Sequence, residues 1–243
     1  MTEPPTGPER VTSDDEPTGE LSIQGIAATV RTCTLCALSE TRTNAVPGEG
    51  SDSPSIMFIG EGPGFNEDQQ GRPFVGRAGK LLDELLGVVP LRRSDVYITN
   101  VVKCRPPENR DPLPEEVRAC WPYLESQISL LRPRVIATLG RHAMNRFLPG
   151  ARISDVHGRS VRWRDIVIFP LYHPAAALRS TALRQTLEED MRRIPGAVLE
   201  SLALNTGTGP ERHAPAGTPA KDTDSSTAGE PPREEQAGQK RLF

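Results

Sequence analysis

The sequence predicts an α/β fold: three layers, α/β/α, around a central parallel sheet of about four strands. The first observation behind this prediction is that short apolar runs alternate along the chain with apolar stripes at helical spacing. The second is that this alternation is confined to residues 21–204. The segments 1–20 and 205–243 cannot bury enough apolar surface to offset chain entropy, so they are predicted to be disordered tails around one domain.

The predicted strands are short runs of mostly apolar residues, as expected for strands buried inside a parallel sheet. They are Ser55–Gly60, Val96–Val102, Arg134–Gly140 and Ile166–His173.

Apolar stripes predict the helices between these strands. The first stripe is Ala78, Leu81, Leu82, Leu85 and Leu86. The second is Val117, Cys120, Leu124, Ile128 and Leu131, with Pro114 suited to the first turn of its helix. A short helix through Phe147 follows the third strand, and a last helix covers about Thr181–Leu202.

Polar side chains stand where three of the predicted strands end. Glu61 follows the first strand, Asn100 lies near the end of the second, and His173 ends the fourth. Ligands of parallel α/β sheets bind beyond the carboxyl ends of the strands. We therefore expect the functional site at this edge.

Charge and composition limit the function classes. The net charge is −3 and the mean hydropathy is −0.45. The first twenty residues hold most of the negative charge, so the predicted domain is mildly basic, which permits contact with phosphates. Because no signal peptide, transmembrane run or lipidation motif is visible, a cytoplasmic protein without membrane contact is expected.

The chain has four cysteines, Cys33, Cys36, Cys104 and Cys120. In a cytosolic chain such a set indicates metal or redox chemistry more often than disulfides. Four thiolates suit either zinc or an iron–sulfur cluster, and the spacing does not choose between them. Buried free cysteines or a redox Cys-x-x-Cys are the alternative, but no predicted strand precedes Cys33, as a redox motif normally requires.

Long motifs match a known family. They are GEGPGFNEDQQGRPFVGRAG at 60–79, TNVVKCRPPENR at 99–110 and HPAAALR at 173–179, together with the cysteines. In order and spacing they resemble the family 4, iron–sulfur type of uracil-DNA glycosylase, from about Cys33 to Leu187. The resemblance implies a 4Fe–4S cluster on the four cysteines. It also implies hydrolysis of the N-glycosidic bond of deoxyuridine in DNA, by a monomer that leaves an abasic site.

The resemblance also assigns the catalytic and base-reading side chains. A flipped uracil leaves as an anion, so the pocket must stabilise that anion, read the base edge and admit one water. His173 would donate to uracil O2, and Asn100 would pair with O4 and N3–H. Phe74 would stack on the base, while Glu61 would orient the water or stabilise the sugar cation.

Further positions complete the expected substrate site. Gly60, Gly62 and Gly64 permit close backbone approach to the base. Glu67 would crowd the C5 position and exclude thymine, although Glu67 and Asp68 could equally form a solvated helix start.

The DNA backbone and the minor groove are expected to meet a separate set of side chains. Leu178 or Arg179 would be the wedge that fills the gap left by the flipped base, and Lys103, Arg105 and Arg110 would contact phosphates. His142 and His157 have no motif around them and are expected to be structural.

Three other functions were weighed. The covalent uracil-trapping relatives carry an inserted basic segment that ends in a histidine, and this chain lacks it after Cys104. Loss of Asn100 or His173 would favour a non-catalytic DNA-binding module, but both residues are present. A zinc-stabilised nucleotide hydrolase would need a phosphate loop or a carboxylate metal site, and neither is visible in the sequence.

The last five residues form a Gln-x-x-Leu-Phe pattern, Gln239 to Phe243. The pattern resembles short peptides that dock repair proteins onto a sliding clamp. Gln239 would hydrogen-bond at the rim of the clamp groove, while Leu242 and Phe243 fill it.

Overall fold

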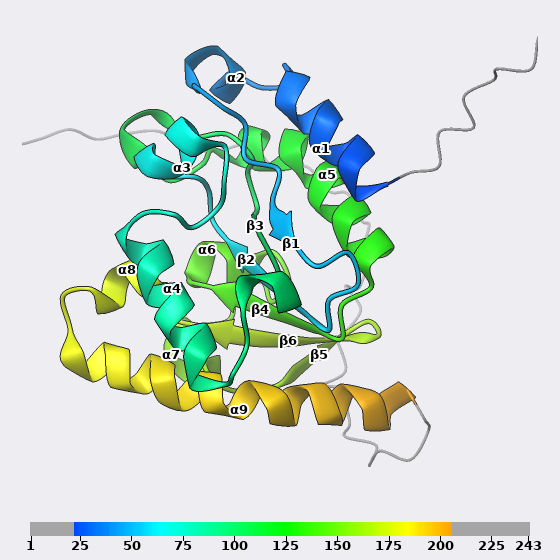
Figure 1. Ribbon diagram of the computed structural model, residues 1–243, viewed down its shortest axis with the longest axis vertical. Coiled ribbons are helices and arrows are strands. Elements are labelled where there is room, and N and C mark those ends of the chain that lie inside the picture. The colour runs from blue at the N-terminus through cyan, green and yellow to red at the C-terminus, as the bar shows by residue number, and fades with distance from the viewer. Residues whose placement is uncertain (1–21, 206–243) are drawn as a thin grey trace, which may run out of the picture. The chain divides into compact units, whose positions relative to one another are not determined.

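Six strands form one sheet in the computed structural model, which describes residues 22–205. Their order across the sheet is β1-β3-β2-β4-β6-β5 (Figure 1). The bounds are β1 Glu49–Gly50, β2 Ile56–Gly60, β3 Tyr97–Asn100, β4 Val135–Leu139, β5 Val161–Trp163 and β6 Ile166–Leu171. β3, β2, β4 and β6 run parallel, which confirms the predicted parallel core of four strands.

The two edge strands were not predicted. β1 pairs antiparallel with β3, and β5 pairs antiparallel with β6. They contain only two and three residues, and none of these residues is fully buried. Strands this short show no usable alternation in the sequence, so pairing with a longer neighbour defines them.

Nine α-helices and two 3-10 turns surround the sheet within the described residues. The helices are α1 Ile23–Thr32, α2 Leu38–Thr41, α3 Phe65–Gln70, α4 Arg77–Val88, α5 Pro114–Leu131, α6 Arg141–Asn145, α7 Ile153–Val156, α8 Pro174–Ala177 and α9 Thr181–Asn205. The 3-10 turns are η1 Arg93–Asp95 and η2 Pro107–Asn109. The predicted helices are confirmed as α4, α5, α6 and α9, whereas α1 was not predicted.

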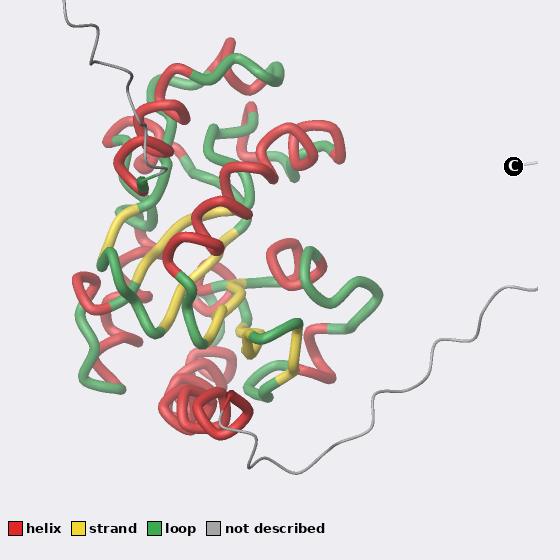
Figure 2. The backbone as a smooth tube through the Cα atoms, turned by 90° about the vertical axis from the view of Figure 1, so that its right-hand side faces the viewer, coloured by secondary structure: helices red, strands yellow, loops and turns green. Residues whose placement is uncertain are grey.

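The sheet separates two apolar cores. Helices lie on both sides of the strands (Figure 2). Along β2, Phe58 faces the core formed with α4 and α9, whereas Met57 and Ile59 face the core formed with α1 and α5. Successive side chains of a strand point to opposite faces, so both sides of each central strand must be apolar. The three predicted layers follow from this pattern.

The predicted tails, 1–20 and 205–243, lie outside the described residues except for Asn205, the last residue of α9. The Gln239–Phe243 pattern also lies outside them. Within residues 22–205, no helix is both long enough and apolar enough to cross a membrane.

Candidate active site and four-cysteine cavity

A pocket of about 360 Å³ opens beyond the carboxyl ends of the parallel strands. Most of the predicted catalytic and base-reading residues line it: Glu61, Gly62, Glu67, Phe74, Asn100 and His173. Gly60 lies directly behind it, at the end of β2. The expected edge of the sheet is therefore where these residues meet.

Phe74 occupies the pocket in an unusual backbone conformation, with φ at +53°. Three features hold it there. The Arg93 guanidinium donates to the carbonyl oxygens of Pro73 and Phe74. Glu67 Oε1 accepts from the backbone N–H groups of Val75 and Gly76 at 2.9 and 2.8 Å. A Cβ at Gly79 would stand 1.8 Å from the Phe74 carbonyl oxygen, so only glycine fits there.

Asn100 presents a buried, unpaired carboxamide oxygen. The residue is 1% exposed, and its Oδ1 has no hydrogen-bond partner among the described residues. A Cβ at Gly60 would lie 2.4 Å from this oxygen and 2.6 Å from Cζ of Phe74. Since unpaired buried polar atoms are costly, this oxygen is a strong candidate for a ligand contact.

His173 caps the short helix α8, and this contact defines its tautomer. Its Nδ1 accepts a hydrogen bond from the Ala175 N–H at 3.1 Å, so in the neutral ring the proton lies on Nε2. Burial lowers the pKa of His173 to about 4, which keeps the ring neutral at ordinary pH. Its centroid lies 5.9 Å from that of Phe74.

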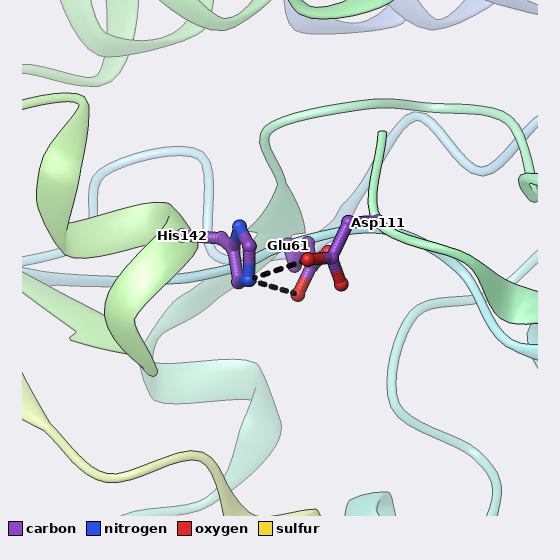
Figure 3. A group of neighbouring side chains, drawn as sticks. All are labelled: Glu61, Asp111 and His142. Atoms are coloured by element: carbon purple, nitrogen blue, oxygen red, sulfur yellow. Dashed lines mark ion pairs between the residues drawn. The ribbon is translucent and has the colours of Figure 1, made fainter. Parts of the chain in front are cut away.

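Glu61, Asp111 and His142 converge at one side of the pocket from three separate elements (Figure 3). His142 Nε2 lies 3.2 Å from Asp111 Oδ2 and 4.0 Å from Glu61 Oε2. Within the part of the chain that the structure describes, the Glu61 carboxylate has no hydrogen-bond donor closer than this. Desolvation is the main cause that raises the pKa of Glu61.

Sequence reasoning missed Asp111 and took His142 as structural, although both lie beside Glu61. The signal for His142 was available, because it closely follows the end of β4, at the edge where ligands bind. Ligand atoms of these three residues lie within 4.8 Å of one another, so a divalent cation could bridge them. However, Arg141 Nε donates to His142 Nε2 at 2.9 Å, and its positive charge disfavours a cation there.

The structure corrects the prediction that Lys103 contacts phosphates. Lys103 is 1% exposed, and its ammonium group donates to Thr99 Oγ1, the Asn100 carbonyl and Gln127 Oε1. Burial lowers its pKa to about 7. It anchors the segment after β3 from inside and does not reach the surface.

The two arginines proposed for phosphate contact lie at the pocket mouth. Arg110 lines the pocket and pairs with the buried Glu116 at 2.6 Å, while Arg105 Nε donates to Asn109 Oδ1 at 2.8 Å. Arg110 is exposed and Arg105 is half-buried, and phosphate contact stays a prediction for both.

Glu67 and Asp68 do lie in the first turn of α3, as the alternative predicted, but this helix start is not solvated. Asp68 is 2% exposed, and its Oδ1 accepts from the backbone N–H groups of Thr43 and Asn44. Glu67 is engaged with the Phe74 loop. Both carboxylates therefore hold loops in place.

The proposed wedge residues follow α8 directly. Leu178 is half-buried and packs against the core of α4 and α9, whereas Arg179 is exposed. His157, taken as structural, pairs with the buried Asp190 at 2.6 Å, away from the pocket.

All four cysteines line a second, smaller cavity between the end of α1, the start of α2, the segment after β3, and α5. Three of the sulfurs accept N–H hydrogen bonds. Arg42 donates to Cys104 at 2.9 Å, the Lys103 backbone donates to Cys120 at 3.2 Å, and the Leu35 backbone donates to Cys33 at 3.5 Å. Donors directed at sulfur are suited to thiolate ligands, which makes this donor set fit for a metal group.

The spacing of the sulfurs bears on which group fits. Around one tetrahedral zinc with bonds of about 2.3 Å, the sulfurs would lie about 3.8 Å apart. Among the described residues, no three cysteine sulfurs lie within 4.8 Å of one another. The described cysteine sulfurs are therefore not gathered at the spacing of a single zinc site.

Comparisons with known proteins agree on one family. A family model described as "Uracil DNA glycosylase superfamily" matches residues 47–193. A type-4 uracil-DNA glycosylase of Sulfurisphaera tokodaii is 49% identical over 183 residues, covering 71% of this chain and 83% of the relative. One of Saccharolobus solfataricus is 50% identical over 183 residues, covering 71% and 85%. A type-5 uracil-DNA glycosylase of Pyrobaculum aerophilum is 32% identical over 169 residues, covering 61% and 74%.

Proposed function

Because this chain belongs to the uracil-DNA glycosylase superfamily and is an N-glycosyl hydrolase of DNA repair, we propose that it removes uracil from DNA in the manner of the type-4 enzymes. The target nucleotide is flipped out of the strand, and its N-glycosidic bond is hydrolysed to leave an abasic site. The observation that carries the proposal is the unpaired, buried Asn100 oxygen beside Phe74.

Base reading follows from the Asn100 carboxamide. Its oxygen accepts from uracil N3–H, and its NH₂ group donates to O4. Cytosine offers an acceptor at N3 and a donor at C4, so the same amide rejects it by leaving buried polar groups unpaired. Phe74 provides the stacking face. Gly60 lets Asn100 and Phe74 pack close to the backbone of β2, because a Cβ there would collide with both side chains.

Bond cleavage uses the neutral His173. As the bond between C1′ and N1 breaks, its electron pair leaves with the uracil and negative charge grows on O2. The Nε2–H of His173 donates to that oxygen, because Nδ1 is already engaged with the Ala175 amide. A water then attacks C1′, and the proton that it loses neutralises the departing uracil anion. The half-buried Glu61 carboxylate orients that water and stabilises the sugar cation.

Two further roles complete the substrate site. Gly62 brings the backbone close to the base, and the Glu67 carboxylate next to Phe74 crowds the C5 position against a thymine methyl group. Leu178 and Arg179 enter the gap left by the flipped base. Arg179 is exposed for this, whereas Leu178 must leave its contact with the core.

The four cysteines hold a 4Fe–4S cluster in this proposal. The cluster supplies a cross-link between the end of α1, the segment after β3, and α5. The four cysteine side chains, their N–H donors and the wide sulfur spacing support it. Yellow-brown purified protein with iron and sulfide in equal amounts is the expected result, and zinc without iron would contradict it.

The central experiment is a strand-cleavage assay on an oligonucleotide with one uracil, followed by alkali to reveal abasic sites. Cleavage is expected at uracil only, and matched oligonucleotides with thymine or cytosine at that position serve as controls. Intact uracil-containing strands with cluster-loaded protein would overturn the proposed function.

The Gln239–Phe243 pattern supports docking to a sliding clamp, with Gln239 at the rim and Leu242 and Phe243 in the apolar groove. A short peptide that orders on binding should bind at roughly micromolar affinity. The test is titration of a clamp from the same source against the full chain and a variant without the last five residues. Equal binding, or none by either, would contradict docking. A cytoplasmic monomer completes the proposal.

A further inference from the structure

Phe65 is an exposed aromatic side chain at the rim of the pocket. It is the first residue of α3, and 55% of its surface is exposed. Gly64, immediately before it, lines the pocket. The other large apolar side chains that are exposed in residues 22–205 are all leucines. Phe65 is thus a flat, open ring next to the place where a base would enter.

Arg105 reaches this ring from a different loop. Its guanidinium carbon lies 5.2 Å from the Phe65 ring centroid, within the range of a cation–π contact. Its Nε donates to Asn109 Oδ1, and both Asn109 and the neighbouring Pro106 line the pocket. Arg105 forms no ion pair within the described part of the chain. Its positive charge is therefore available to an anionic ligand.

Single exposed apolar residues are common, so exposure alone would carry little weight. Here an aromatic ring and an uncompensated guanidinium, from segments forty residues apart in sequence, meet at the mouth of the pocket. Such pairs of aromatic and arginine side chains are typical of single-stranded nucleic-acid sites, where rings stack on bases and arginines contact phosphates.

We propose that Phe65 and Arg105 form a subsite for the nucleotide next to the flipped uracil. The neighbouring base stacks on Phe65, and Arg105 contacts the phosphate that joins it to the deoxyuridine. A base whose neighbour has left the stack loses a stacking partner, and the Phe65 ring replaces that partner. This inference rests on the proposed function, because it needs a flipped nucleotide in the adjacent pocket.

The test is a thermodynamic cycle between the protein and the DNA. Affinity and single-turnover uracil release are measured for wild type and Phe65→Ala on a single-stranded oligonucleotide with one uracil. The same measurements are repeated with the base removed from the nucleotide 5′ or 3′ of the uracil, its sugar and phosphate being kept. The loss from Phe65→Ala on the intact strand should be about 5-fold or more in affinity.

On one of the two base-deleted strands, Phe65→Ala should cause no further loss, because the stacking partner is already absent. Phe65→Tyr should restore wild-type affinity, since it keeps the ring. Leu199→Ala, which removes an apolar side chain that is 67% exposed on α9, is the matched control and should have no effect. An equal loss on all three strands, or none on the intact strand, would overturn the inference.

Arg105→Gln tests the second half of the subsite. It should weaken binding and lower the salt dependence of affinity by about one phosphate contact. Because Arg105 follows Cys104, the visible absorbance of the cluster must match wild type before the comparison is made. An unchanged salt dependence would exclude the phosphate contact. Absence of uracil release by wild type would instead count against the proposed function.

Discussion

The base pocket and the four-cysteine cavity are joined by the segment from Asn100 to Cys104, yet they differ in whether their polar atoms have hydrogen-bond partners. In the pocket, Asn100 Oδ1 and the Glu61 carboxylate have no close donor among the described residues, and Phe74 adopts a left-handed backbone conformation. In the cavity, Cys104 and Cys120 accept N–H hydrogen bonds. Unpaired polar atoms fit the proposed reversible binding of a base in the pocket, and donors directed at sulfur fit the proposed resident cluster in the cavity.

Lys103 connects the two sites. Its ammonium group donates to the Asn100 carbonyl, while its backbone N–H donates to the Cys120 sulfur. A change at the cavity should therefore move the base-reading residue, whereas a change within the pocket should leave the cavity intact. The following predictions test this asymmetry, from the largest expected effect to the smallest.

Loss of a cysteine should have the largest effect. Cys120→Ala removes one ligand of the proposed cluster, which would tie α5 to α1, and should lower the free energy of unfolding by about 4 kcal/mol or more. Soluble yield and thermal unfolding measure this, with Ser39→Ala, at the same cavity, as the control. A soluble, fully active Cys120→Ala protein with wild-type absorbance would remove Cys120 from the ligand set.

Loss of the anion-stabilising donor should affect catalysis and leave the cluster intact. His173→Ala should lower kcat by about 10²- to 10³-fold, the usual effect of removing one such donor. Single-turnover uracil release measures the rate, and cluster absorbance and melting temperature should stay near wild type. A wild-type rate would exclude His173 from the mechanism, and a lost cluster would refute the asymmetry between the sites.

Displacing Asn100 and Phe74 from their positions should have a smaller effect. A Cβ in Gly60→Ala would meet Asn100 Oδ1 at 2.4 Å and Phe74 Cζ at 2.6 Å, so kcat/KM should fall by about 10-fold or more. Gly87→Ala is the matched control, because its Cβ would meet nothing within 4 Å. Equal activity of the two variants would show that the reaction does not depend on the close packing of Asn100 and Phe74 against Gly60.

The pH dependence should be the mildest effect. Burial lowers the pKa of His173 to about 4, so the neutral donor persists from pH 7 to pH 5, and the contribution of His173 to kcat/KM should fall only as the pH approaches 4. Desolvation raises the pKa of Glu61, so its protonation contributes at higher pH in the same direction. A Glu61→Gln profile isolates His173, and an acid limb near pH 6.5 in that variant would contradict a buried neutral ring.

The lowered pKa of His173 also predicts how the stability of the fold depends on pH. Below about pH 6.5 an unfolded histidine binds a proton that the folded, neutral His173 does not. Stability should therefore decrease as the pH falls from 6.5 toward 4. His173→Ala should reduce this part of the pH dependence in thermal unfolding.

Much of the fold could be predicted from the sequence, because the apolar patterns that predict its strands and helices are local. The four central strands and the helices α4, α5 and α9 each have an apolar pattern that needs no distant partner. β1 and β5 lack such a pattern. The motif residues Glu61, Phe74, Asn100 and His173 were likewise predicted together, and they line one pocket.

The sequence by itself determined the sheet layers, the edge at which the polar residues gather and the set of four cysteines. Only the tertiary structure decided which charged side chains face that edge. Lys103 is buried because Thr99 and Gln127 accept from it, and His142 lies beside Glu61 because α6 follows the adjacent strand β4. Burial and pairing depend on contacts between distant segments, whereas the period of an apolar pattern is set within a few residues.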